Sequence, residues 1–304
     1  MPSLLRSASL SFSGMRYHIT HRTVFTYGEP AHDNVNEVRL SPVANPHQSL
    51  EFFVLKVIPA TRLRRFTDLY SNPVHHFEIG HSHRHLSIES RSIVSVARSI
   101  DYAALPYGFS HSELNTLRSR EECCEFLHDS RYVKRSPRIW REALDIQNGS
   151  TDVFQTAYAL MKFIYDNCAY LPGLSDASTT AADVCEEKRG VCQDFAHLLI
   201  VYCRSLGIPC RYVSGYIWDP GAGSNETMRG AQASHAWAEI YLPEHGWIGL
   251  DPTNNKVANE QYVVVATGRD YDDVAPVRGT FYGGGLQRSM EVVVKVRKID
   301  FDQE

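Results

Sequence analysis

Residues 190–205 have the sequence GVCQDFAHLLIVYCRS, which predicts an amphipathic helix that begins at Cys192 and ends at Ser205. Four apolar residues recur at helical spacing and would face a core: Phe195, Leu198, Leu199 and Tyr202. Gly207 and Pro209 follow, a pair that commonly stops a helix. The sequence therefore places a cysteine at the first position of a helix.

A cysteine at the start of a helix meets unpaired backbone N–H groups and the positive end of the helix dipole. Both favour the thiolate over the thiol, and the thiolate is the form that attacks a carbonyl carbon. Helix starts are also partly exposed, and Gly190 lets a substrate backbone come close. Most free cysteines are simply small buried residues, but this position favours Cys192 as a nucleophile.

Two downstream segments carry the partners that a cysteine nucleophile needs. Residues 234–241 (SHAWAEIY) alternate like a strand and place His235 on one face of it. Asp251 ends a second strand and is followed by proline, so its carboxylate can fix the tautomer of a neighbouring histidine. A lone strand histidine is usually structural, and an Asp-Pro pair is usually a turn. Together with Cys192, they predict a triad of nucleophile, base and carboxylate.

Three segments resemble the core motifs of the transglutaminase-like superfamily: GVCQDFA at 190–196, SHAWAEIY at 234–241 and LDPTN at 250–254. The resemblance extends to RYVSGY at 211–216. The upstream segment 17–96 resembles the N-terminal domain of the bacterial transglutaminase-like cysteine proteases. The resemblance implies an α+β fold, in which a papain/transglutaminase-like core domain is preceded by an all-β sandwich domain.

The resemblance also implies a reaction. Cys192 is expected to attack an amide carbonyl of a peptide or protein and form a thioester, with His235 as general base and then acid and Asp251 as the orienting residue. Water or an amine then resolves the thioester, and hydrolysis is the default because water outcompetes amines unless a site excludes it. The alternatives are a protein-glutamine crosslinking transglutaminase and a non-catalytic interaction module on the same fold.

Three further residues are candidates near the reacting atoms. An oxyanion hole is expected to use the backbone N–H of Cys192 and one further donor. Tyr170 and Gln193 are the candidates for that donor, and each is as readily a structural residue. Trp237 is either a wall of the path taken by the acyl acceptor or a core aromatic. The polar loop 219–233 is either a mobile substrate gate or a plain insertion.

The first part of the chain has the turn spacing of an all-β domain. Alternating, β-branched segments are separated by turns at roughly ten-residue intervals from Met15 onward. Met15 opens the first strand, so translation starts either there or at Met1. We expect a tail at 1–14, a β-sandwich domain at 15–112, a catalytic domain at 113–282, and a last strand within 283–304 that packs back on a sheet.

A run of histidines lies in the expected β domain, and three of them would share one strand face: His81, His83 and His85. Three imidazoles on one face can hold zinc or nickel, yet no cysteine or carboxylate completes the set nearby. Such a run of histidines is more often an exposed, partly charged strand than a metal site. We expect no metal and no other cofactor, with this cluster as the weak candidate for a metal site.

The overall composition excludes several classes of protein. The 304 residues are 43% hydrophobic and 22% charged, as in a globular rather than a disordered protein. A formal net charge of −4 gives no field that attracts nucleic acid, and no apolar run reaches the ~18 residues of a membrane span. Seven cysteines without a paired pattern favour reduced thiols and a cytoplasmic protein. The oligomeric state is not predicted.

Overall fold

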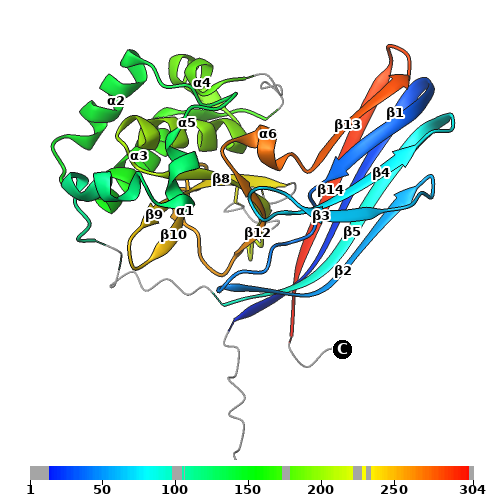
Figure 1. Ribbon diagram of the computed structural model, residues 1–304, viewed down its shortest axis with the longest axis horizontal. Coiled ribbons are helices and arrows are strands. Elements are labelled where there is room, and N and C mark those ends of the chain that lie inside the picture. The colour runs from blue at the N-terminus through cyan, green and yellow to red at the C-terminus, as the bar shows by residue number, and fades with distance from the viewer. Residues whose placement is uncertain are drawn as a thin grey trace, which may run out of the picture.

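The computed structural model describes residues 14–97, 105, 107–172, 179–221, 228–230 and 234–300. The expected tail at 1–14 lies outside these residues except for Gly14. The chain forms a β-rich part and a second part in which helices cover another sheet (Figure 1). The predicted α+β class is therefore confirmed.

The β-rich part is built from both ends of the chain. Among the described residues its strands are β1 (Met15–Val38), β2 (Gln48–Ile58), β3 (Arg64–Thr67), β4 (Pro73–Ile79), β5 (His83–Val96), β13 (Val277–Gly283) and β14 (Arg288–Ile299). Their order is β2-β5-β1-β4-β3, and β13 and β14 also pair with β1. The all-β character is confirmed with one difference. The strands form one hydrogen-bonded network rather than two separate sheets, because the long β1 pairs with four others.

β1 joins two groups of strands. Residues 16–26 lie between β5 and β14, whereas the end of β1, from Asn34 to Val38, lies between β4 and β13. Both groups bury side chains in one apolar cluster, which includes Tyr27, Val38, Val57, Phe77 and Ile88. The hydrophobic effect therefore holds the two groups together.

The last strand lies beside the first. β14 pairs antiparallel with β1 from Tyr27 opposite Arg288 to Arg16 opposite Ile299. Three consecutive glycines with positive φ, Gly283 to Gly285, form the turn that leads from β13 into β14. The sequence does not predict β13, because its residues (VRGTFYG) lack a clear apolar alternation.

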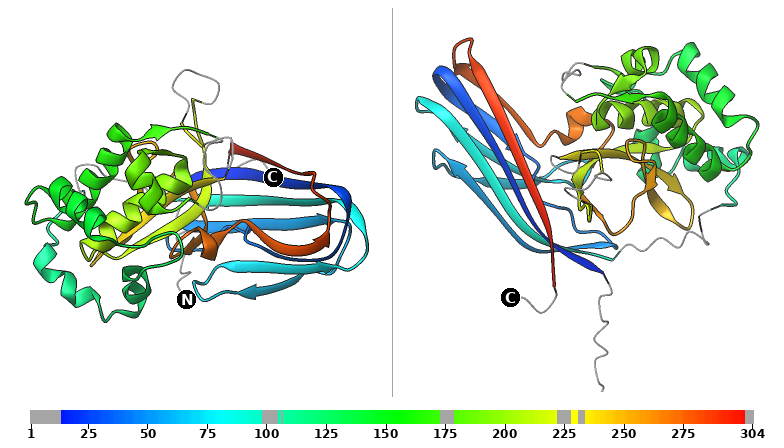
Figure 2. Two further views of the ribbon diagram at one scale, coloured as in Figure 1. Left: turned by 90° about the horizontal axis from the view of Figure 1, so that it is seen from above. Right: turned by 180° about the vertical axis from the view of Figure 1, so that it is seen from behind.

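The second part packs its helices on one face of a five-stranded antiparallel sheet with the order β11-β10-β9-β8-β12 (Figure 2). The strands are β8 (Cys210–Ile217), β9 (His235–Leu242), β10 (Gly246–Asp251), β11 (Lys256–Val257) and β12 (Tyr262–Gly268). A small parallel pair adds β6 (Ala169–Tyr170) and β7 (Arg189–Gly190).

The described helices of this part are α1 (Glu121–Cys124), α2 (Pro137–Gln147), α3 (Val153–Asn167), α4 (Ala181–Glu187), α5 (Cys192–Ser205) and α6 (Tyr271–Val274), with 3-10 turns at His111–Leu117 and Glu125–Leu127. The predicted bounds of α5 are confirmed. Every side chain of α5 from Asp194 to Arg204 is buried, and the helix packs on β9. No helix in the described ranges is long and apolar enough to cross a membrane.

The two parts share a buried interface that fixes β12. Side chains of β1, β5 and β14 pack against side chains of β8 and β12. Two buried amides add hydrogen bonds to the backbone of β12. Gln48 accepts the N–H of Val264 at 2.8 Å, and Asn72 exchanges two 2.8 Å hydrogen bonds with the backbone of Thr267. The β-rich part therefore positions a strand that reaches the site described next.

Candidate active site

Cys192 is the first residue of α5, and its side chain is partly exposed. Val191 before it is extended, with a φ of −116°, and its side chain offers no cap to the helix. The Asp194 carboxylate accepts the backbone N–H of Val191 at 2.8 Å, which fixes the first turn. The sulfur therefore lies at the positive end of a buried helix, as the sequence predicts.

His235 begins β9 and Asp251 ends β10, and the antiparallel pairing of these strands brings the two side chains together. The Nε2 atom of His235 lies 2.9 Å from Oδ2 of Asp251, and both side chains are fully buried. A carboxylate thus holds the imidazole through one ring nitrogen and leaves Nδ1 for a second partner. In the described part of the chain, this buried Nδ1 has no hydrogen bond of ordinary geometry.

The Asp251 carboxylate is held by several donors besides the histidine. Its Oδ1 atom accepts the backbone N–H of Thr253 at 2.9 Å, and its Oδ2 atom accepts the Asn254 side chain at 2.8 Å. The Tyr262 hydroxyl on β12 donates to the same Oδ2 atom at 2.9 Å. Sequence reasoning missed Asn254 and Tyr262 as supporting residues. Asn254 was findable because it belongs to the LDPTN segment, whereas no local pattern marks Tyr262.

The charges of the pair stabilise each other. Burial alone lowers the pKa of His235, but the charge and hydrogen bond of Asp251, together with the adjacent Cys192 thiol, raise it to about 10. Burial raises the pKa of Asp251, but His235 and the other donors outweigh burial and lower it below its usual value. The two groups therefore favour each other's charged form, with the cysteine beside the ring.

Trp237 is buried against the His235 ring. Its side chain has no exposed surface, and its ring stacks on the imidazole with centroids 6.1 Å apart. Gly215 on β8 makes room for the indole, because a Cβ at that position would lie 2.5 Å from it. This burial favours the core-aromatic alternative for Trp237, and the choice between it and a wall of the acyl-acceptor path stays a prediction.

Tyr170 and Gln193 both lie near the cysteine. The parallel pairing of β6 and β7 places Tyr170 opposite Gly190, two residues before Cys192. Burial raises the pKa of Tyr170 to about 12, and the nearby Cys192 adds to this effect whereas Arg229 opposes it. Gln193 is half-buried at the second position of α5. The choice between them as the second oxyanion donor stays a prediction.

Only part of the loop at 219–233 is described. Residues 222–227 and 231–233, and with them most of the expected substrate gate, lie outside the described residues. The Asp219 carboxylate accepts the backbone N–H groups of Gly221 and Met228 at 2.8 Å each. The segment 228–230 is therefore anchored to the end of β8.

The three histidines of the weak metal candidate do not form one group. His83 is buried, where its Nδ1 donates to the carbonyl of His81 and its Nε2 accepts from Asn34. His81 precedes the strand, and His85 is exposed on β5. The expectation of three imidazoles on one strand face is therefore wrong. Within the described ranges, no group of three or more His, Cys, Asp or Glu side chains is placed to hold a metal ion.

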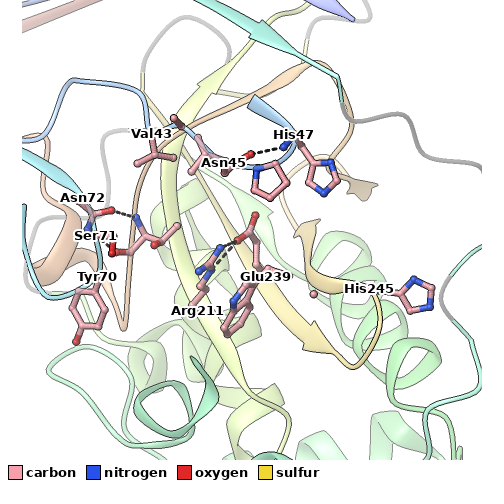
Figure 3. A pocket seen from close by; sticks show the side chains of 15 residues that line it. Val43, Asn45, His47, Tyr70, Ser71, Asn72, Arg211, Glu239 and His245 are labelled. Atoms are coloured by element: carbon pink, nitrogen blue, oxygen red, sulfur yellow. Dashed lines mark hydrogen bonds and ion pairs between the residues drawn. The ribbon is translucent and has the colours of Figure 1, made fainter. Parts of the chain in front are cut away.

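A separate cavity of about 350 Å³ opens between the two parts of the molecule (Figure 3). Arg211 and Glu239 lie at its centre, where two hydrogen bonds of 2.6 and 2.8 Å join the guanidinium to the buried carboxylate. The same guanidinium stacks on Trp247, 4.2 Å from the ring centroid. None of the three triad residues lines this cavity, so it is distinct from the site around Cys192.

Comparison with known proteins finds similar sequences and a similar fold. The profile of the transglutaminase-like superfamily matches residues 142–252, and that of the bacterial transglutaminase-like N-terminal region matches residues 17–95. An uncharacterised protein of Mycobacterium leprae is 32% identical over 93% of this chain and 99% of its own length. A protein-glutamine gamma-glutamyltransferase of Pseudomonas aeruginosa is 30% identical over 32% of this chain and 15% of its own length.

A solved structure shares the fold of the whole chain. It is described as a candidate cysteine protease from Cytophaga hutchinsonii, and it superimposes with a TM-score of 0.74 at 23% sequence identity. The match covers 96% of this chain and 93% of the other. Both the β-rich part and the helical part therefore belong to one shared architecture.

Proposed function

The chain belongs to the transglutaminase-like superfamily, and we propose that it is a thiol-dependent hydrolase of peptide or protein amide bonds. The observation that carries this proposal is the buried pair of His235 and Asp251 beside a cysteine at the start of α5. Cys192 acts as nucleophile, His235 moves the protons and Asp251 orients the ring.

In the first half of the proposed reaction, the sulfur of Cys192 attacks the amide carbonyl carbon. The carbonyl oxygen becomes an oxyanion near the backbone N–H of Cys192. His235 gives its proton to the leaving nitrogen, the C–N bond breaks and an amine departs. The acyl group is then held as a thioester on Cys192, and His235 is neutral.

In the second half, water resolves the thioester. Neutral His235 takes a proton from a water molecule as its oxygen attacks the thioester carbon. The C–S bond breaks, a carboxylic acid leaves, and the imidazolium is restored beside the thiolate. Asp251 stays ionised throughout and stabilises the imidazolium each time it forms.

A crosslinking transglutaminase is the second candidate function. The observation that favours it is the similarity over a third of the chain to a protein-glutamine gamma-glutamyltransferase. The first half of the reaction is then the same at a glutamine side chain, with ammonia as the leaving group. A primary amine replaces water in the second half and leaves a substituted amide.

The deciding experiment compares wild type with Cys192→Ser and Cys124→Ser, the latter at another partly exposed cysteine. Each protein is given a peptide mixture in ¹⁸O-labelled water, with and without a labelled primary amine. We expect ¹⁸O in the new carboxyl groups from wild type and Cys124→Ser, and none from Cys192→Ser. Amine incorporation in place of ¹⁸O supports the second candidate. Turnover that survives the loss of the Cys192 thiol would falsify both.

A further inference from the structure

Arg229 is an exposed residue whose backbone is hydrogen-bonded to Asn254, a residue that holds Asp251. Its N–H donates to Oδ1 of Asn254 at 2.9 Å, and its carbonyl accepts the Asn254 amide at 3.2 Å. The same Asn254 amide donates to the Asp251 carboxylate. Met228, the preceding residue, is buried in an apolar cluster. The position of Arg229 is therefore set by the residues that hold Asp251.

The Arg229 side chain lies across two aromatic rings. Its guanidinium carbon is 5.4 Å from the ring centroid of Tyr165, near the end of α3, and 5.6 Å from that of Tyr170. Stacking on ring faces restricts the plane of a guanidinium but leaves the N–H groups along its edge able to donate. In the parts of the chain that the structure describes, no carboxylate forms an ion pair with Arg229. The described residues of the site thus hold a preoriented cation and place no carboxylate in an ion pair with it.

Arg229 is also close to the reacting groups. A Cβ on Gly230, the next residue, would lie 2.5 Å from Nδ1 of His235, so this backbone passes directly over the ring nitrogen that does not face Asp251. Arg229 stacks on Tyr170, and the charges of Cys192 and Asp251 both act to raise the pKa of Tyr170. Arg229 therefore stands at the edge of the space where an amide substrate would approach the sulfur.

We propose that Arg229 determines specificity by binding a carboxylate that the substrate carries next to the scissile amide. This inference rests on the proposed function, because it assigns a substrate class to the same site. A planar guanidinium matches a carboxylate through paired N–H donors. A peptide offers a carboxylate in two ways, as an acidic side chain or as its C-terminal carboxylate, and both present the same two oxygens.

The test uses two electrophiles that differ only in the group that Arg229 would recognise. Iodoacetate carries a carboxylate where iodoacetamide carries a neutral amide, and each alkylates a thiolate by displacing iodide. The rate at Cys192 is followed by mass spectrometry of the peptide that contains it, in wild type, Arg229→Gln and Arg229→Lys. Arg138→Gln is the matched control, because Arg138 is an exposed arginine on α2 that pairs with Glu186.

We expect Arg229→Gln to lower the iodoacetate-to-iodoacetamide rate ratio about five- to tenfold at low ionic strength, and added salt to reduce the difference. Arg229→Lys should retain part of the ratio, and Arg138→Gln all of it. An unchanged ratio in Arg229→Gln would overturn the inference. If instead Cys192 reacts with both reagents no faster than a free thiol, the proposed function fails. The ratio and the absolute rate therefore test the two claims separately.

Peptide substrates then distinguish the two sources of the carboxylate. Three matched peptides are compared, one with an acidic residue beside the scissile bond, one with a free C-terminus there, and one neutral at both places. We expect kcat/KM of wild type to be about tenfold higher for one of the two carboxylate-bearing peptides than for the neutral peptide. The preferred peptide identifies the source of the carboxylate, and Arg229→Gln should abolish the difference. Equal kcat/KM for all three in wild type contradicts the assignment.

Discussion

Nε2 of His235 and Oδ2 of Asp251 lie 2.9 Å apart at a place that solvent does not reach. Removing either partner leaves the other as a buried group without its counter-charge. Because the contact occupies Nε2, Nδ1 is the imidazole nitrogen that is left for Cys192. In the proposed reaction, activity depends on the orientation that this contact imposes, and we expect stability to depend on the charge that it compensates.

We expect Asp251→Asn to lower kcat for an amide substrate by about 10³- to 10⁴-fold. An asparagine does not compensate the imidazolium charge, and its amide N–H favours the wrong tautomer of His235. The measurement is kcat for the variant and the wild type on one peptide. Denaturant unfolding of both proteins establishes that the variant is folded at the assay temperature.

Tyr262→Phe is the control for this variant. It removes one donor to the same carboxylate but leaves the carboxylate charge in place. We expect a loss of about tenfold in kcat, as for other residues that support a reacting group indirectly. Equal losses in Tyr262→Phe and Asp251→Asn would contradict a distinct role for the Asp251 charge.

The pair also predicts how stability changes with pH. The pKa of His235 is raised from 6.5 to about 10 in the folded protein. Its contribution to the unfolding free energy is therefore complete below pH 6.5 and is lost as pH rises toward 10. The pKa of Asp251 is lowered from 3.8, so its contribution is complete above pH 3.8 and is lost in more acidic solution. We expect the pair to stabilise the fold most between about pH 4 and 6.5.

Denaturant unfolding of wild type and Asp251→Asn at several pH values measures this effect. The difference in unfolding free energy between the two proteins should shrink steadily from pH 6.5 to pH 10, because the variant lacks the carboxylate that raises the histidine pKa. A difference that stays constant over this range would show that His235 is already neutral near pH 7 in the folded wild type.

The sequence predicts those features of the site that depend on local pattern. The bounds of α5 follow from a helical apolar period and from Gly207 with Pro209, and the structure has the same bounds. The strands of His235 and Asp251 follow from alternation and a proline stop. Their pairing was also predictable, because two consecutive strands joined by a short turn are usually neighbours in a sheet.

Features that depend on contacts between distant segments were not predictable. Tyr262 reaches Asp251 only because β12 lies at one edge of the sheet, beside β8, and no residue near Tyr262 indicates that position. The sequence predicts that the last strand packs back on a sheet but not that β13 pairs with the end of β1, and this second pairing helps to join the two strand groups. The burial of Trp237 depends on space left by Gly215 on the neighbouring strand. Alternation alone did not separate a core aromatic from a substrate wall.

Gly215→Ala should destabilise the protein by about 1–3 kcal/mol. The added Cβ would lie 2.1 Å from the carbonyl oxygen of Val263 and 2.5 Å from the indole of Trp237, and both neighbours are buried. Gly80→Ala is the matched control, because the nearest atom to a Cβ there is 3.8 Å away. Urea unfolding of both variants checks this. An equal loss in both would contradict crowding at Gly215, because the backbone-entropy effect of a Gly→Ala change stabilises the folded state.

Asn72→Ala should lower the unfolding free energy by about 1–3 kcal/mol and leave kcat/KM nearly unchanged. Asn72 is fully buried in the β-rich part, and its amide exchanges two 2.8 Å hydrogen bonds with the backbone of Thr267 on β12. Alanine leaves the Thr267 N–H and C=O without these partners between the two parts. Asn167→Ala removes a hydrogen bond at the exposed end of α3, so it should change stability by less than about 0.5 kcal/mol. If both variants unfold at the same urea concentration as wild type, the two parts are not held together through this amide.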